Sequence, residues 1–217
     1  MKKDDNKIIR IDFARKQKTK RSNNDRNSEM LNCFGFNKAE KGYKTIFPLV
    51  MMPYDLEADV AIIFEREALV WLLMDEFKNK KVYKLGGTTI QCLLCYDAAD
   101  LIDSEDYDLF VPDKVQECKR IFYLGNLDSD GINEFCLLKN QQELQKLEPW
   151  VDMYKIMIDR GLNNESNTFD LTERAAKENF AAFANYFNLN YRNKLNNLLN
   201  IDKRGVLQTA LKIEDFR

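Results

Sequence analysis

The sequence predicts an α/β protein built on a mostly parallel sheet flanked by helices. Between residues 58 and 148, short apolar runs of strand length alternate with longer amphipathic runs of helix length. That alternation is typical of parallel strands joined by right-handed helical crossovers. After residue 149 the apolar spacing is helical, and before residue 29 the chain is polar and basic. We expect, in order, a disordered basic arm over 1–28, an irregular lead-in over 29–57, the α/β domain over 58–148 and a helical extension over 149–217.

Two apolar runs are the most distinct strands of the predicted sheet. Residues 60–64 are followed by Glu65, and residues 121–124 lead into a turn over 125–131. Unbroken apolar runs of this length are expected for strands buried on both faces. In chain order, the other core elements that we expect are a helix over 66–80, a strand over 81–87, a helix over 88–102 capped by Thr88 or Thr89, an acidic loop over 103–112 and a helix over about 130–147.

The segments outside the core carry weaker patterns. A cluster of basic side chains in the arm either contacts phosphates or keeps the arm solvated; its members are Arg15, Lys16, Lys18, Lys20 and Arg21. The lead-in mixes aromatic residues with Gly and Pro and has room for one short strand over 45–51. In the extension we expect helices over 150–161, from Thr172 to Phe187, over 194–200 and over 205–216.

The composition excludes several classes of protein. A net charge of −2 argues against a surface that contacts nucleic acid everywhere, although a local basic patch remains open. No apolar run approaches the ~20 residues that cross a bilayer, and the charged N-terminus lacks the apolar segment of a secretory signal. Five cysteines without framework spacing fit a reducing cytoplasm. We therefore expect a cytoplasmic protein without membrane contact.

The chain contains no histidine. This removes the catalytic sites in which histidine acts as acid, base or zinc ligand. An enzyme of this composition has to use carboxylates, Lys, Tyr, Cys or a metal ion held by oxygen ligands.

Acidic residues follow the two distinct strands at the point where each strand ends. Glu65 follows the first, and the turn after the second carries Asp128 and Asp130. In a parallel sheet both strand ends lie at the same edge, where open α/β sheets bind their ligands. The three carboxylates could there share a Mg²⁺ or Mn²⁺ ion, which prefers oxygen ligands and activates water without histidine. The alternative is an ordinary turn, since Asp, Ser and Gly are favoured in turns.

These residues resemble a known family. A strand ending in Glu65, the Gly86-Gly87 pair and the sequence GNLDSDG over 125–131 are similar to the Toprim domain of primases, topoisomerases and several nucleases. The resemblance is closer to the Toprim-bearing C-terminal domain of the Wadjet plasmid-defence nuclease subunit (JetD-like) and its type IIB topoisomerase relatives. The segments LEPWVDMYKIMI and GVLQTALKIEDF, the second with Gln208, look like later helices of that group. The similarity spans residues 58–217.

The resemblance implies a Rossmann-like fold and a Mg²⁺-dependent site that cleaves DNA. Glu65 would match the family glutamate, a metal ligand or general acid/base, and Asp128 the second aspartate of the family pair. The first aspartate falls on Asn126, which keeps an oxygen but loses the charge, so metal affinity should drop. Asp130 could substitute as a ligand. Without a winged-helix segment carrying a nucleophilic tyrosine, cleavage would be hydrolytic.

Three further candidates have ordinary explanations. Cys92 and Cys95 have the spacing of a redox or zinc pair, but without a second pair they are better interpreted as buried structural thiols. The Gly86-Gly87 pair either cradles a phosphate or forms a tight turn. Lys84 and Arg66 either touch a DNA backbone or are solvated.

Three hypotheses about function follow from the sequence. The first is a Toprim-like, metal-dependent DNA nuclease or nuclease subunit in DNA metabolism or plasmid and phage defence, with Glu65 and Asp128 catalytic and with Glu65, Asp128, Asp130 and Asn126 around the metal. The second is a catalytically degenerate Toprim module that binds DNA or scaffolds a larger complex. The third is a small-molecule-binding α/β domain, because a fold does not fix a function. DNA is the expected partner, with a condensin-like ATPase complex or self-association as further possibilities.

Overall fold

The computed structural model of the chain describes residues 44–46, 50–53, 59–80, 84–85, 88–90, 92–96, 107–163 and 167–216. The basic arm expected over 1–28 and most of the lead-in lie outside the described residues. In the described part of the lead-in, the single strand expected over 45–51 is replaced by two short strands, β1 (Lys44–Ile46) and β2 (Val50–Pro53).

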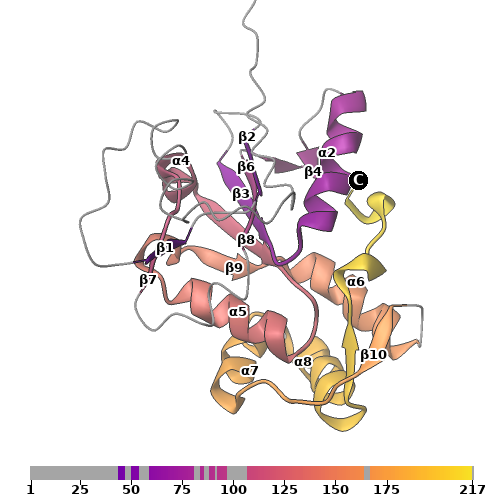
Figure 1. The fold of residues 1–217 in the computed structure, drawn as a ribbon. Coiled ribbons are helices and arrows are strands. Elements are labelled where there is room, and N and C mark those ends of the chain that lie inside the picture. Colours follow the sequence, from indigo (N-terminus) through magenta and orange to yellow (C-terminus); the bar gives the residue numbers. More distant parts are fainter. Residues whose placement is uncertain are drawn as a thin grey trace, which may run out of the picture.

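A five-stranded sheet forms the centre of the molecule, and four of its strands run parallel (Figure 1). In spatial order its strands are β2, β6 (Cys92–Cys95), β3 (Val60–Phe64), β8 (Arg120–Leu124) and β9 (Leu147–Pro149). Only β2, at one edge, pairs antiparallel with its neighbour. The prediction of an α/β fold with a mostly parallel sheet is therefore confirmed.

The chain leaves the central pair β3–β8 in opposite directions. After β3, helix α2 (Glu67–Lys80) leads toward β6 on one side, and after β8, helix α5 (Ser129–Lys139) leads to β9 on the other. Right-handed crossovers then place these two helices on opposite faces of the sheet. The strand order consequently reverses between β3 and β8. Open α/β sheets bind ligands at such a reversal, outside the carboxyl ends of the strands.

The elements between α2 and β8 differ from the prediction. Residues expected as the second helix instead form strand β6 and half of a small antiparallel hairpin, β4 (Lys84–Leu85) with β5 (Thr88–Thr89). Of the expected strand over 81–87, the described residues form β4, which pairs with β5 and not with the central sheet. Leu93 and Leu94 are completely buried, because β6 lies between β2 and β3. An unbroken apolar run of this kind fits a buried strand as well as a helix, and tertiary pairing decides between them.

Two further core elements were not expected. The acidic loop expected over 103–112 contains strand β7 (Tyr107–Leu109), which pairs parallel with β1, and a short helix, α4 (Asp113–Glu117), follows it. The helix expected to reach residue 147 ends at Lys139. A 3-10 turn, η1 (Gln142–Leu144), then leads into β9, which pairs with β8.

The C-terminal extension is mostly helical but also contains a hairpin. Its helices are α6 (Val151–Leu162), α7 (Lys177–Ala184), α8 (Leu189–Asn196) and the π-helical turn η2 (Asn197–Ile201). Strand β10 (Thr168–Asp170) pairs antiparallel with β11 (Arg204–Val206), followed by the 3-10 turns η3 (Gln208–Ala210) and η4 (Ile213–Phe216). The helix expected over 205–216 is therefore wrong, and so is the early start at Thr172. No helix in the described ranges combines the length and apolar character needed to span a membrane.

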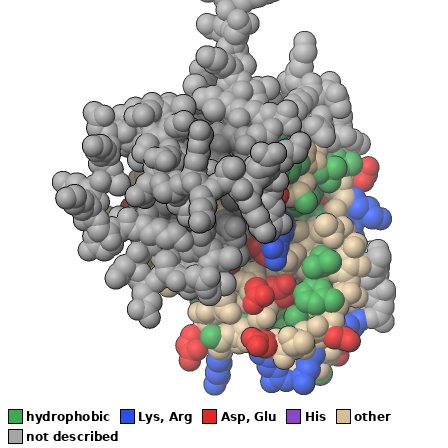
Figure 2. All heavy atoms as spheres, viewed as in Figure 1, with side chains coloured by type: hydrophobic (Ala, Val, Ile, Leu, Met, Phe, Trp, Pro, Cys, Tyr) green, Lys and Arg blue, Asp and Glu red, His purple; other side chains and the backbone are tan. Residues whose placement is uncertain are grey.

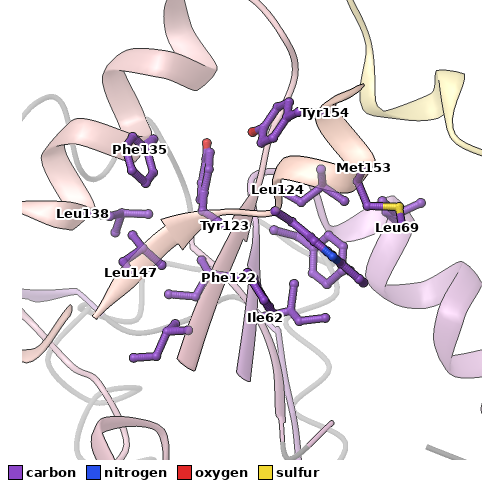
Figure 3. Packing of buried hydrophobic residues seen from close by; sticks show 14 of the residues in the cluster. Ile62, Leu69, Phe122, Tyr123, Leu124, Phe135, Leu138, Leu147, Met153 and Tyr154 are labelled. Atoms are coloured by element: carbon purple, nitrogen blue, oxygen red, sulfur yellow. The ribbon is translucent and has the colours of Figure 1, made fainter. Parts of the chain in front are cut away.

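The hydrophobic core is continuous from the sheet to the extension (Figure 3). Phe122 stacks on Trp150 with ring centroids 5.6 Å apart, and Phe135 meets Phe183 edge to face at 5.5 Å. Tyr154 of α6 also meets Phe183 edge to face, at 5.0 Å. Because these aromatic contacts join β8, α5, α6 and α7, the extension packs on the sheet domain as part of one core.

Candidate functional site

The predicted site residues lie together at the reversal of strand order. Glu65 directly follows β3, and its backbone N–H donates to the carbonyl of Leu124 at the end of β8, at 3.1 Å. The turn over 125–131 follows β8 and leads into α5. The expectation that the ends of these two strands adjoin is met by this backbone contact.

The Glu65 carboxylate is buried and surrounded by hydrogen-bond donors. Its side chain is 1% exposed. Oε2 accepts from the backbone N–H of Asn126 at 2.5 Å, and Oε1 accepts from the Asn126 side-chain Nδ2 at 2.8 Å. Oε1 also pairs with the Nε of Arg66 at 3.0 Å. Both carboxylate oxygens therefore have donor partners within the chain.

The Asn126 amide is held in one orientation by two neighbours of opposite kind. Its Nδ2 donates to Glu65, while its Oδ1 accepts from the backbone N–H of Gln208 at 2.9 Å. Rotating the amide by half a turn would bring donor against donor and oxygen against oxygen, so both hydrogen bonds fix the same orientation. Asn126 is itself buried, with 6% of its surface exposed.

Gln208 brings the C-terminal segment to this site. Its side-chain Nε2 donates to the carbonyl of Leu124, and its own surface is buried. Beside this contact, the backbones of Leu127 and Val206 exchange hydrogen bonds of 2.8 and 3.0 Å. The segment after β11 therefore covers the end of β8 and contributes to the polar network around Asn126.

Two glycines let the turn approach Glu65 closely. A Cβ on Gly125 would lie 2.5 Å from the Tyr123 hydroxyl and 2.8 Å from Oε2 of Glu65. A Cβ on Gly131 would overlap the backbone oxygen of Asn126 and lie 3.0 Å from the same Oε2. Both positions require glycine because a side chain would push the turn away from the carboxylate.

Asp128 and Asp130 differ in their surroundings. Asp128 is 7% exposed and acts as the N-cap of α5, where its Oδ1 accepts from the backbone N–H of Gly131 at 2.8 Å. This is a usual role for Asp at a helix start. Asp130, in the first turn of the same helix, is exposed. An acidic residue there interacts favourably with the helix dipole.

Burial and mutual repulsion raise the pKa of the two inner carboxyl groups. Desolvation raises the pKa of Glu65 to about 6, helped by the negative charges of Asp128 and Asp130 and opposed by the Asn126 hydrogen bond and by Arg66. Desolvation likewise raises the pKa of Asp128, with a further contribution from Asp130. The charge of Asp128 acts on Glu65, which places the two carboxylates in the same electrostatic environment.

Two buried tyrosines complete the inner wall of the site. The hydroxyl of Tyr154 on α6 accepts from the backbone N–H of Gly125 at 2.7 Å. The hydroxyl of Tyr123 is buried and has no hydrogen-bond partner among the described residues. Desolvation raises the pKa of both phenols. Both therefore stay neutral near pH 7, and neither acts as a phenolate ligand there.

The residues present do not fit a divalent cation as they are arranged. A cation on Glu65 would compete with the Asn126 amide and Arg66, which already donate to this carboxylate. Within the described ranges, no three side chains of His, Cys, Asp or Glu are grouped so that they could hold a metal. Asn126 is joined to Glu65 by one backbone and one side-chain hydrogen bond, whereas the Asp128 side chain is bonded to the backbone of Gly131.

Of the other predicted candidates, Cys95 and Arg66 contact Glu65, and the glycine pair lies outside the described residues. Cys95 is a buried free thiol on β6, in agreement with a structural role, and its Sγ contacts the backbone oxygen of Glu65 at 3.6 Å. Gly86 and Gly87 lie outside the described residues. Arg66, which had been weighed only as a solvated base or a DNA contact, pairs with Glu65 while its side chain stays 62% exposed.

Sequence reasoning missed the contacts that reach the site from the extension. Gln208 was noted only as part of a similar segment, and Tyr154 was not singled out. Their hydrogen bonds to residues 124–126 join positions far apart in the chain, and a local sequence pattern does not predict such contacts. The available signal was Asn126 itself, because a buried amide in place of a carboxylate needs both a donor and an acceptor as neighbours.

Comparisons of the chain with models of protein families, with curated proteins and with solved structures find no match. The resemblance to the Toprim domain therefore remains a prediction from the residues quoted above.

Proposed function

We propose that this chain is a catalytically degenerate, Toprim-like module that binds DNA within DNA metabolism or plasmid and phage defence. The observation that carries the proposal is that Asn126 donates both its backbone N–H and its side-chain amide N–H to the Glu65 carboxylate. In this arrangement a neutral amide takes the place that an aspartate and a cation would share in a nuclease of the Toprim type.

The fold supports the proposal at a coarser level. The site lies where the strand order reverses, which is the usual ligand-binding position of an open α/β sheet. The exposed Arg66 at that edge is the described cation nearest to Glu65, and a solvent-facing guanidinium is suited to phosphate contacts. A module of this kind would act beside a catalytic partner, such as a condensin-like ATPase complex, or with a second copy of itself.

A plasmid assay tests the proposal against the nuclease hypothesis. Supercoiled plasmid is incubated with the full chain and Mg²⁺ or Mn²⁺, beside a Glu65→Gln variant, and the same protein is used in a gel-shift assay. We expect retarded DNA without nicking for both proteins. Nicking by the wild type that the variant lacks would overturn the proposal in favour of a metal-dependent nuclease.

A thermal-shift titration gives an independent readout. We expect the midpoint of the wild type to stay unchanged on addition of Mg²⁺ or Mn²⁺, because the Glu65 oxygens already have donors. Anything that binds only the folded state raises its stability. A saturable rise of the midpoint that Glu65→Gln abolishes would therefore show a cation site and contradict the proposal. In the gel-shift assay, unretarded DNA at every protein concentration would show that DNA is not the ligand.

A further inference from the structure

Helix α8 and the turn η2 present a face of asparagine side chains to solvent. The exposed or half-exposed asparagines are Asn190, Asn193, Asn196, Asn197 and Asn200. Their spacing of three and four residues places them on one side of the helix. The opposite side is buried through Leu195, Leu198 and Leu199, so the asparagine face has no cover from the described parts of the chain.

This face is polar without being acidic. Residues 185–201 contain Arg192 and Lys194 but no Asp or Glu. Lys194 pairs with Asp159 at 2.6 Å, whereas Arg192 donates to the backbone carbonyls of Phe187 and Asn185 and keeps its charge unopposed by a carboxylate there. Figure 2 shows Lys and Arg side chains along the lower edge of the molecule, where Figure 1 places α7 and α8, with Asp and Glu side chains between them.

A solvent-exposed helix face made of asparagines lowers the stability of the helix. Asparagine is a poorer helix former than Lys, Glu or Gln, which usually occupy such positions. Two large apolar side chains also remain open on this helix, Leu189 with 73% and Ile201 with 65% of their surface exposed. In the major groove, side-chain amides and cations hydrogen-bond to the edges of bases. Apolar side chains contact the methyl group of thymine there.

From these observations we infer that the exposed face of α8 and η2 is the DNA-contacting surface of the chain and lies in the major groove of duplex DNA. The inference rests on the proposed function for its ligand and adds the surface that binds it. The charge favours this occupant, because residues 185–201 themselves carry two cations and no carboxylate, and the Arg192 side chain has no ion-pair partner among the described residues, which suits a polyanion. A helix that follows a short turn, as α8 follows α7, is also the element that helix-turn-helix proteins insert into the groove.

The test measures binding of a short fluorescent DNA duplex by anisotropy, with the full chain. The face variants are Asn193→Ala with Asn197→Ala, and Asn193→Asp with Asn197→Asp, which keeps side-chain size but adds two negative charges. The matched control is Asn140→Ala with Asn163→Ala, two exposed asparagines at the ends of α5 and α6. Circular dichroism checks that each variant is folded, and the alanine pair favours the helix.

We expect the alanine pair to weaken binding about tenfold, since each amide contact to a base contributes a substantial part of the affinity. The aspartate pair should weaken it further and the control should bind like the wild type. Wild-type binding that both face variants retain would overturn the inference and leave the proposed function standing. A wild type that binds no duplex would overturn both. A changed oligomeric state with unchanged DNA affinity, seen by light scattering, would assign the face to a second copy and equally overturn the inference.

Discussion

Asn126 donates two hydrogen bonds to the Glu65 carboxylate, beside the ion pair with Arg66. An aspartate at this position would present only acceptors to Glu65, and the two carboxylates would then need a cation between them. The amide removes that need, because Nδ2 donates to Oε1 of Glu65 and Oδ1 takes the N–H of Gln208. The Asn126 side chain thus closes a hydrogen-bonded network between Glu65 and Gln208.

Substituting Asn126→Asp should open this network. In metal-free buffer we expect the free energy of unfolding to fall by about 2 kcal/mol, because a buried hydrogen bond to a charged group is replaced by repulsion. Added Mn²⁺ should restore part of the loss by binding the new carboxylate beside Glu65 and Asp128. Chemical denaturation with and without Mn²⁺ measures both effects.

The control for this experiment is Asn126→Ala. It loses the same hydrogen bonds but gains no ligand, so its stability should fall similarly and should not respond to Mn²⁺. An Asn126→Asp protein as insensitive to Mn²⁺ as the alanine variant would show that Glu65 and Asp128 are not placed to share an ion.

The raised pKa of Glu65 predicts a specific dependence of stability on pH. The ordinary pKa is 4.5 and the folded value is about 6, so the folded state holds this proton more tightly than the unfolded state. The stability contributed by the protonated form is complete below about pH 4.5 and is lost as the pH rises through 6. Over that range the loss amounts to about 2 kcal/mol.

Glu65→Gln isolates this contribution because glutamine does not titrate. The difference in unfolding free energy, wild type minus variant, should fall between pH 4.5 and 7, while other titrating groups cancel in the comparison. Denaturant titrations at four or five pH values measure it. A difference that stays constant would mean that Glu65 ionises in the folded protein at its ordinary pKa, and one that rises with pH would mean that folding lowers this pKa; either outcome contradicts the prediction.

At the scale of elements, the sequence predicted those strands whose pattern has one interpretation. The runs that became β3 and β8 are apolar, bounded by polar residues, and too short for helices, so their ends and the position of Glu65 and Asp128 were predictable. The run containing Cys92–Cys95 was ambiguous, because its apolar stretch continues into residues that extend it to helical length. Pairing with β2 and β3 decided its state.

Local sequence patterns did not predict the contacts of β11 and Gln208. Strand β11 is three residues long, and its pairing with β10 and Leu127 depends on how the whole extension folds back. Short strands of this kind have too few residues to show a period. The acidic residues of the site were therefore predictable from topology, whereas the residue that orients Asn126 was not.

The packing of helix α7 on the core predicts how much stability its buried phenylalanine contributes. Phe183 is completely buried, and its ring contacts those of Phe135, Tyr154 and Phe187. Phe183→Ala should lower the free energy of unfolding by about 3–5 kcal/mol, as for other large-to-small changes in cores. Tyr186→Ala is the matched comparison, because that ring also meets Phe135 but is 36% exposed. Equal losses in the two variants, measured by urea denaturation, would contradict the packing described here.

At the scale of the whole molecule, the sheet domain and the extension form one unit. The sequence suggested a boundary near residue 149, yet several contacts cross it. The backbones of Leu127 and Val206 pair, Phe122 stacks on Trp150 at 5.6 Å between ring centroids, and Phe135 meets Phe183 edge to face at 5.5 Å. The extension also closes the site through Gln208. A boundary in the sequence pattern is therefore not a boundary in the fold.

This unity predicts a single cooperative unfolding transition for the described part of the chain. The two tryptophans make the test direct: Trp71 lies on α2 of the sheet domain, and Trp150 lies at the start of the extension. In the single-tryptophan variants Trp71→Phe and Trp150→Phe, the fluorescence midpoint in urea should coincide with the midpoint by circular dichroism of the same protein, as two-state unfolding requires. Comparing two probes within each variant cancels any loss of stability that the substitution itself causes. Separate midpoints, with the Trp150 signal changing before or after the bulk of the secondary structure, would show that the extension unfolds independently and that Gln208 can leave Asn126 while the sheet stays folded.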